Sequence, residues 1–320
     1  MGDASEDVVR TTACVLSSLR RTLESQKYLE VIIPVLRASR PSSFVEPLRV
    51  TLGDERVATR TGVVKRPETH AQLSSVPGGY LQALLPRVGN VYTVAPMFRG
   101  ELIPTWLTEF RYVQVVGRGG IEDAIKLGVT LVGNALQAME KERLAVSEQA
   151  KAFGDPIRMS YADAMKQVGG RVGEPLSHDQ YRDLAAANRN RPVIIMGVPL
   201  HLEPYGALGA RTSRDGPAFF EMVVPEAGEL GAGKEYESNT DAFWESTDGA
   251  AQRRAGLPWH DRRDLEVVEE LLSTLPSPSF SFGMGFERLV QYALGKRDIG
   301  EAVAFPVVNG AALRPPLVME

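Results

Sequence analysis

The order of apolar runs along the chain is the feature that most restricts its fold. Runs typical of buried strands occur at residues 28–36, 91–96, 107–116, 193–198 and 218–225. The segments between them differ widely in length and helical content, whereas a doubly wound fold places one helix after each strand. The chain is therefore expected to form an α+β domain with a mainly antiparallel sheet flanked by helices.

Helical spacing of apolar residues marks the segments expected to cover this sheet. The predicted helices lie near residues 6–25, 78–86, 121–147, 262–275 and 285–295. Short extended segments are expected around 46–52 and 57–63. The polar helical stretch at about 150–190 is interpreted as a helical insertion into a single catalytic domain spanning residues 1–320.

Composition limits the class of protein and its partners. The 320 residues are 43% hydrophobic and 24% charged, which allows a sizeable core. The formal net charge of -4 argues against a broad basic surface for nucleic acid. An acidic N-terminal segment without an apolar run of membrane-spanning length predicts a cytoplasmic protein. The single cysteine, Cys14, excludes an internal disulfide and is expected to be buried.

The first candidate site is the string Phe98-Arg99-Gly100-Glu101, which Glu109-Phe110 follows on the next predicted strand. An arginine at a strand end can offer paired N–H donors to a phosphate, and a phenylalanine on the facing strand can stack on a purine. Both features suit ATP. Taken alone, the string is better explained by ordinary core packing, with Phe98 and Phe110 in the core and Arg99 paired to Glu101 or Glu109.

The second candidate site is Gly283-Met284-Gly285-Phe286-Glu287-Arg288, where a strand end rich in glycine opens into a helix. Glycine permits close approach of a ligand, and the start of a helix supplies unpaired N–H groups and a positive dipole end. These properties suit a polyphosphate. Most isolated strings of this kind are only turns.

The third candidate site is the pair Glu221 and Glu229, which lie eight residues apart across a predicted turn. Two carboxylates brought together in this way can hold Mg²⁺, which prefers oxygen ligands and keeps water or substrate phosphate in its shell. An isolated pair of glutamates is more often solvated at the surface.

The order of these strings resembles the class II aminoacyl-tRNA synthetases. KYLEVIIPVL near 26–37 is similar to motif 1, VYTVAPMFRGE and TEF near 91–116 to motif 2, and SFSFGMGFERL near 279–306 to motif 3. Between them, PAFFEMVVPEAGELGAGKE resembles the acidic strand and turn of asparaginyl-tRNA synthetases. The resemblance, which spans about residues 26 to 306, implies ATP and Mg²⁺ as cofactors, and a homodimer with Pro34 at its interface.

The resemblance also implies a role for each matching residue. Arg99 would bind the α-phosphate, Phe110 would stack on adenine, and Glu101 would help to place the ATP. Arg288 would bind the γ-phosphate next to Gly285, while Glu221 and Glu229 would hold Mg²⁺. The expected catalytic residues are Arg99 and Arg288, since the chemistry requires charge stabilisation on the phosphates and no side-chain nucleophile.

The acid-binding part of the sequence departs from the family. Gln114 stands where the relatives carry an acidic residue that helps to bind the substrate ammonium group, and Val116 replaces a second acid. Tyr236 stands where they carry an arginine that meets the side chain of the amino acid, so aspartate is a doubtful substrate. Ser75 and Gly233 complete the expected substrate-binding set.

The remaining departures concern the acceptor. The short segment before Pro34 leaves no room for an OB-type anticodon-binding barrel, and none is expected in this chain. The loop 102–109 is short and carries Trp106 instead of the family's basic residue. We therefore expect a tRNA-independent ligase that adenylates a carboxylic acid and transfers it to ammonia or a small amine, forming an amide in specialised biosynthesis.

Three alternatives stay open at the level of sequence. The first is a stand-alone asparagine synthetase that uses aspartate and ammonia, for which the family offers a precedent. The second is a truncated synthetase that charges a tRNA or a carrier protein. The third is a catalytically idle, synthetase-like binding subunit, against which the retained ATP-binding residues speak.

Overall fold

The computed structural model describes residues 3–37, 48–52, 55–59, 62–66, 69–100, 106–203, 206–213, 216–254, 260 and 262–307. Within these residues the main sheet has eight strands in the order β1-β7-β8-β15-β14-β13-β10-β9. The bounds of these strands are β1 Leu29–Glu30, β7 Val91–Phe98, β8 Glu109–Arg118, β15 Ser279–Gly285, β14 Gly228–Glu235, β13 Phe219–Val224, β10 Val193–Met196 and β9 Ile157–Ser160. Only the two outermost pairs, β1 with β7 and β9 with β10, are parallel. The predicted mainly antiparallel sheet is confirmed.

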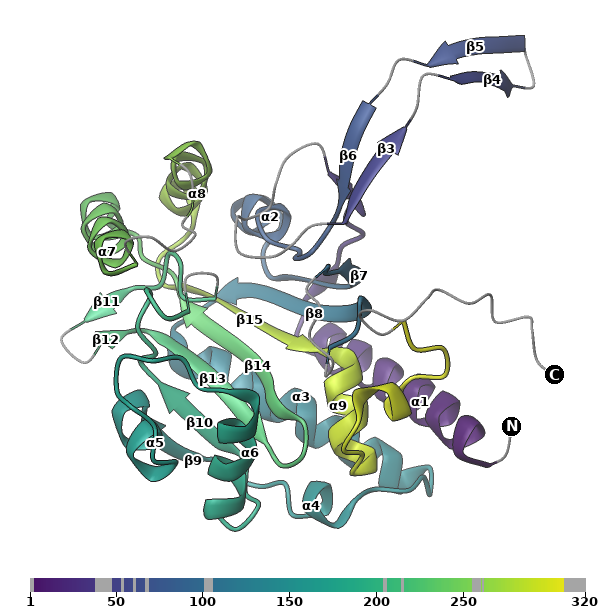
Figure 1. Cartoon of the computed structure of the whole chain (residues 1–320), viewed down its shortest axis with the longest axis vertical. Helices are drawn as coiled ribbons and strands as arrows, with labels where there is room; N and C mark the ends of the chain where they lie inside the picture. Colours follow the sequence, from purple (N-terminus) through teal and green to yellow (C-terminus); the bar gives the residue numbers. More distant parts are fainter. Residues whose placement is uncertain are drawn as a thin grey trace.

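Three helices cover one face of this sheet, as Figure 1 shows: α1 (Asp3–Ser25), α3 (Ile121–Lys141) and α9 (Phe286–Leu294). Their apolar stripes pack on every second residue of the central strands, because side chains alternate between the two faces of a strand. Gly128 lets α3 approach closely, since a Cβ atom there would lie 2.8 Å from the Phe282 ring. Cys14 belongs to this core and is buried, as expected.

Of the remaining helices, α4 (Glu148–Lys151) packs against α9, whereas the others contribute to a second core or lie beyond the edge of the sheet. These others are α2 (Tyr80–Val88), α7 (Thr240–Arg253), α8 (Arg262–Thr274), α5 (Tyr161–Gln167) and α6 (His178–Ala187), and a 3-10 turn lies at Ile299–Ala302. None of the helices in the described ranges combines the length and the apolar character that crossing a membrane requires.

Small strands form an arm that projects from the main body (Figure 1). One sheet joins β2 (Leu36–Arg37), β6 (Thr69–Leu73) and β3 (Arg49–Leu52), and a hairpin joins β4 (Glu55–Thr59) to β5 (Gly62–Arg66). A separate pair joins β11 (Thr212–Ser213) to β12 (Gly216–Pro217).

Several predicted boundaries were wrong. The run 28–36 forms only the short ends β1 and β2, with Pro34 in the non-strand segment between them, since proline has no N–H for a ladder. The extended segment predicted at 57–63 is divided between two strands, because β4 ends at Thr59 and β5 begins at Gly62. The helix predicted at 121–147 ends at Lys141. The insertion at about 150–190 is not wholly helical, because it contains the edge strand β9.

Candidate active site

The candidate site lies on the face of the main sheet that α1, α3 and α9 leave free. Val113, Val115 and Phe282 point towards those helices, so the alternate positions on the same strands point the other way. Three neighbouring strands contribute most of this face: Phe110, Tyr112 and Gln114 on β8, Ser281, Gly283 and Gly285 on β15, and Ala232 and Lys234 on β14.

Arg99 directly follows β7, where its guanidinium packs among aromatic rings. Its Cζ atom lies 5.0 Å from the ring centroid of Phe110 and 5.7 Å from that of Trp106. The Nε atom is buried, and it has no hydrogen-bond partner among the described residues. A buried donor without a partner is unfavourable unless a ligand satisfies it. Arg99 is therefore a cation that aromatic packing holds in place, with a donor available for an anion. Glu101 lies outside the described residues.

Arg288 lies in the first turn of α9, which Gly285 precedes as the N-cap residue. Its Nη1 atom donates a hydrogen bond to the carbonyl oxygen of Ala227 in the turn between β13 and β14. Burial lowers the pKa of Arg288, the negative charge of Glu229 opposes this effect, and Arg99 lowers the pKa further. The two arginines predicted to bind phosphates are therefore electrostatic neighbours.

Acidic side chains gather beside these arginines. Glu221 is 2% exposed on β13, and its Oε2 atom accepts a hydrogen bond of 2.9 Å from the Tyr181 hydroxyl. Burial, followed by the charges of Glu229 and Glu203, raises the pKa of Glu221 well above its ordinary value. Glu203 follows β10, and burial together with the Glu229 charge raises its pKa to about 7. Crowding of like charges is the electrostatic signature of a cation site.

The donor set fits a magnesium ion that substrate helps to coordinate. No group of three or more His, Cys, Asp or Glu side chains in the described part of the chain is arranged to hold a metal ion by itself. Mg²⁺ needs only one or two protein carboxylates when phosphate oxygens and water complete its shell. Glu221 and Glu229 would be the protein ligands of such an ion.

The predicted acid-binding residues lie towards the other end of β8 and β14. Gln114 Nε2 donates to the carbonyl oxygen of Phe282 at 3.2 Å. The Tyr236 hydroxyl accepts a hydrogen bond of 2.9 Å from Gln82 Nε2 on α2, and burial raises the pKa of Tyr236 to about 12. Ser75 lies between β6 and α2, and its buried Oγ atom has no partner among the described residues.

Gly233 is in a different position from the rest of its predicted set. A Cβ atom at Gly233 would lie 2.6 Å from the Phe220 ring, so this residue faces the helical side of the sheet. The rings of Phe220 and Phe282, on the strands either side, stack there with centroids 6.0 Å apart. Gly233 is thus a packing position, and only its backbone is available to a substrate.

Four residues of this face escaped the sequence reasoning: Tyr181 and His178 on α6, Glu203 after β10, and Lys234 on β14. Lys234 carried a usable signal, because it is two residues before Tyr236 and must share its face of the strand. The other three come from the insertion and a loop, and no spacing in the sequence links them to the motifs.

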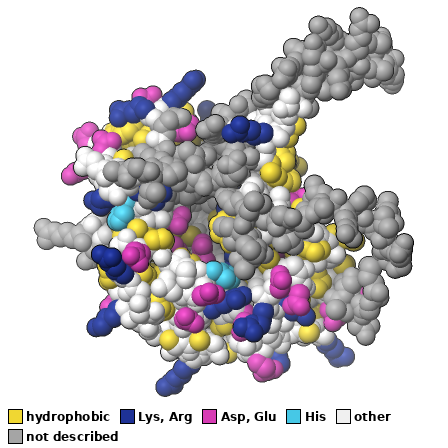
Figure 2. All heavy atoms as spheres, viewed as in Figure 1, with side chains coloured by type: hydrophobic (Ala, Val, Ile, Leu, Met, Phe, Trp, Pro, Cys, Tyr) yellow, Lys and Arg dark blue, Asp and Glu magenta, His cyan; other side chains and the backbone are white. Residues whose placement is uncertain are grey.

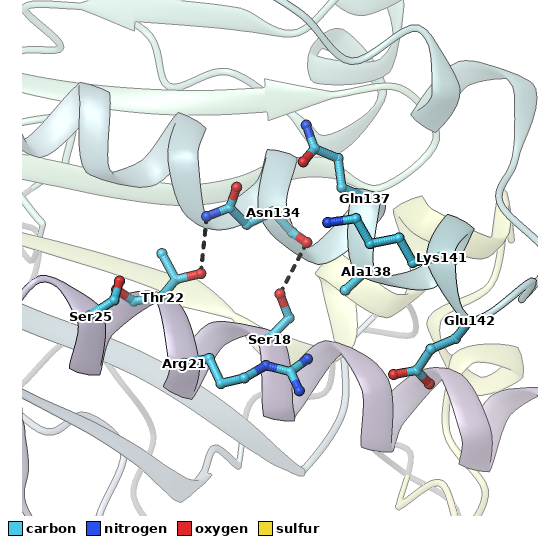
Figure 3. Close-up of a pocket in the computed structure, with 9 residues that line it drawn as sticks. All are labelled: Ser18, Arg21, Thr22, Ser25, Asn134, Gln137, Ala138, Lys141 and Glu142. Carbon is cyan, nitrogen blue, oxygen red and sulfur yellow. Dashed lines mark hydrogen bonds between the residues drawn. The ribbon is translucent and has the colours of Figure 1, made fainter.

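The surface around this site has no single sign of charge. Basic and acidic side chains are interspersed over the described part of the face in view (Figure 2). A hollow of about 450 Å³ lies elsewhere, between α1 and α3 (Figure 3). There Ser18 donates to the carbonyl oxygen of Asn134 at 3.0 Å, and the Asn134 amide donates to Thr22 at 3.1 Å. These bonds join the two helices.

Comparison with known proteins identifies the family of this chain. The sequence profile of the family described as tRNA synthetases class II (D, K and N) matches residues 2–309. The asparagine–tRNA ligase of Pseudoalteromonas atlantica is 26% identical over 341 residues, which cover 95% of this chain and 70% of the relative. That of Vibrio cholerae is 25% identical, with 93% of this chain and 69% of the relative covered.

Solved structures share the fold. The asparaginyl-tRNA synthetase of Pyrococcus horikoshii, complexed with asparaginyl-adenylate, superposes with a TM-score of 0.78 at 23% identity, covering 98% of this chain and 70% of that one. A putative aspartyl-tRNA synthetase from Leishmania major gives 0.73 at 15% identity, covering 98% and 67%. With its antiparallel sheet, its paired arginines and the match over nearly its whole length, this chain belongs to the class II tRNA synthetase family of the D, K and N enzymes.

Proposed function

We propose that the chain is an ATP-dependent ligase that activates a carboxylic acid as its acyl-adenylate and transfers the acyl group to ammonia or a small amine without tRNA. The observation that carries the first half is Arg99, whose buried Nε lacks a partner among the described residues and whose guanidinium lies 5.0 Å from the Phe110 ring. An aromatic face next to a free cationic donor suits a purine nucleotide and its phosphate.

Each half of the reaction uses this face differently. A carboxylate oxygen of the acid attacks the α-phosphorus of ATP, forming a C–O–P linkage while the bond to pyrophosphate breaks. Arg99 and Arg288 would stabilise the charge that develops on the phosphates. Glu221 and Glu229 would hold Mg²⁺, which supplies further charge neutralisation when bound.

In the second half, the nitrogen of ammonia or an amine attacks the acyl carbon and AMP leaves, so that an amide forms and the nitrogen loses a proton. The neutral Gln114 and Tyr236 support an acid other than the amino acids of the relatives, because a charge-assisted partner for an ammonium group and one for a side-chain carboxylate are both replaced.

The test is ATP–pyrophosphate exchange across a panel of amino acids and other carboxylic acids, followed by AMP release with ammonia or amines. An acid that supports exchange, and an amide product in RNase-treated enzyme, are the expected results. Absence of exchange with every acid of the panel would refute adenylate formation.

A second candidate is the charging of a tRNA with asparagine. It is favoured by the names of the relatives, which are asparagine–tRNA ligases. Exchange with asparagine as the preferred acid, followed by recovery of aminoacylated tRNA, would establish this activity instead.

A further inference from the structure

Lys234 lies next to Tyr236 of the predicted acid-binding set, and the reaction proposed above gives it no role. Lys234 is on β14, where its cross-strand neighbours are Ser281 on β15 and Phe219 on β13. Ser281 in turn pairs with Val116 on β8. Gln114, Gly283 and Ala232 form the neighbouring row on the same face, which is nearer to Arg99. Lys234 is therefore farther than Gln114 from the predicted phosphate-binding residues.

Among the described residues, the contacts of Lys234 leave most of its donors unused. Its Nζ atom donates one hydrogen bond of 2.6 Å to the carbonyl oxygen of Leu208 and lies 5.5 Å from the Tyr236 ring centroid. No ion pair joins it to a carboxylate among the residues that the structure places. An ammonium group has three N–H donors, so two remain for a ligand.

The surroundings of Lys234 disfavour its charged form unless an anionic ligand is bound. Burial lowers the pKa of Lys234 to about 8, and the negative charge of Glu203 opposes this effect. The other groups of the pocket, Gln114, Gln82, Ser281 and Tyr236, are neutral, the last because burial raises its pKa to about 12. Apart from Glu203, the neighbours of this cation are therefore neutral, and a buried cation with few charged neighbours favours an anionic ligand.

We propose that Lys234 binds an anionic group at the far end of the acid, so that the substrate class is a dicarboxylic acid or another acid with a second anionic group. The inference rests on the proposed function, because it concerns the acid that is activated. The charge that is absent at Tyr236, which directly follows β14, is supplied two residues earlier by Lys234, whose Nζ atom lies 5.5 Å from the Tyr236 ring centroid. The carboxylate that reacts would lie towards Arg99, and the second anion towards Lys234.

A purely structural lysine would give a different result. The bond to Leu208 also ties the segment 206–210 to the sheet, and loss of that tie would weaken the use of every acid equally. If Lys234 instead binds the anionic group, its loss should change the ratio of kcat/KM between an anionic acid and its neutral isostere. The decisive quantity is therefore a selectivity ratio.

The experiment measures ATP–pyrophosphate exchange with matched pairs: succinate and succinamate, aspartate and asparagine, glutarate and glutaramate. The wild-type enzyme should prefer the diacid in at least one pair by about tenfold or more in kcat/KM, as expected for a charge-assisted contact. Lys234→Met should bring that ratio close to one, mainly through KM for the diacid. Lys234→Arg should retain part of the preference.

Lys126→Met provides the matched control, because Lys126 is an exposed lysine on α3, on the helical side of the sheet. Its ratios should equal those of the wild type. Two results would overturn the inference and leave adenylate formation intact. The first is a wild-type enzyme that prefers the neutral member of every pair that it uses. The second is an equal loss of kcat/KM for both members of a pair in Lys234→Met. If no acid of this set supports exchange, the affinity of the ATP-loaded protein is measured for both members of each pair. Absence of a preference for the diacid in these affinities would also overturn the inference.

Discussion

Arg99 and Arg288 share a predicted role but differ in what else they support. The Nε atom of Arg99 has no partner among the described residues, so Arg99→Ala should lose about hundredfold or more in ATP–pyrophosphate exchange without a change in Tm. Arg288 also donates to the carbonyl oxygen of Ala227, so Arg288→Ala should lose exchange and lower Tm as well. Arg118→Ala, at the exposed end of β8, is the control. Wild-type exchange in Arg99→Ala would disprove the ATP site.

Glu203 should make stability depend on pH. Its folded-state pKa of about 7 exceeds the ordinary value of 4.5, so the folded protein retains a proton that the unfolded chain has lost, and the free energy of unfolding falls as pH rises between these values. Glu203→Gln removes this effect. The free energy of unfolding of Glu203→Gln minus that of the wild type should therefore increase by about 2 kcal/mol between pH 5 and pH 8. Urea unfolding of both proteins without magnesium measures the difference, and a difference independent of pH would contradict the assignment.

At this scale the sequence predicted the residues that lie within contiguous strings. Arg99, Phe110, Arg288, Glu221 and Glu229 were singled out because each string places its own backbone at a strand end or a turn, and their roles stay predictions. Residues whose position depends on tertiary packing, such as Glu203 and Tyr181, could not be found. Gly233 was assigned to the substrate because its string suggested it, while the alternation of β14 directs it to the opposite face.

Helix α6 connects the insertion to the candidate magnesium ligands. Its Tyr181 hydroxyl donates to Glu221 at 2.9 Å, which favours the ionised form of a carboxyl group whose pKa is otherwise raised by burial. Tyr181 is thus a positioning residue. Tyr181→Phe should raise the Mg²⁺ concentration for half-maximal exchange several-fold, because the lost hydrogen bond contributes about 1 kcal/mol.

Magnesium titrations of exchange for the wild type, Tyr181→Phe and Tyr161→Phe measure this effect. Tyr161 is the matched control, since its hydroxyl bonds to the carbonyl oxygen of Glu174 within the insertion. Equal magnesium dependence in the three proteins would show that α6 has only a structural role.

The elements themselves were predictable where local pattern and tertiary environment agree. The strands β7, β8, β10 and β13 overlap the apolar runs from which strands were predicted, and residues at their centres are buried. Strand β9 (IRMS) has exposed alternate residues and gains its strand form by pairing with β10, so it was hidden in a polar stretch. The run at 28–36 was misjudged because apolar character does not guarantee a partner strand.

Exposed apolar side chains gather next to Pro34, which supports the predicted homodimer. Ile32 is 97% exposed, Leu29 53% and Leu36 51%. Side chains of this kind are usual in an interface between subunits. Ile32→Asp should therefore shift the protein from dimer to monomer at micromolar concentration in light scattering. Val172→Asp, at an exposed valine of the insertion, should leave the dimer unchanged. A wild-type protein that is monomeric would contradict this prediction.

The proposed function combines a predicted ATP-binding face, which contains Arg99 and Arg288, with predicted acid-binding residues among which Lys234 supplies a charge next to Tyr236. The central claim is that the activated acid passes to ammonia or a small amine. The most direct measurement is AMP release by RNase-treated enzyme, with the acid identified by exchange and with ammonia or an amine, in the presence and absence of added tRNA. The rate should be the same in both cases, with an amide as product. Strict dependence of product on tRNA, or recovery of an aminoacylated tRNA, would contradict it.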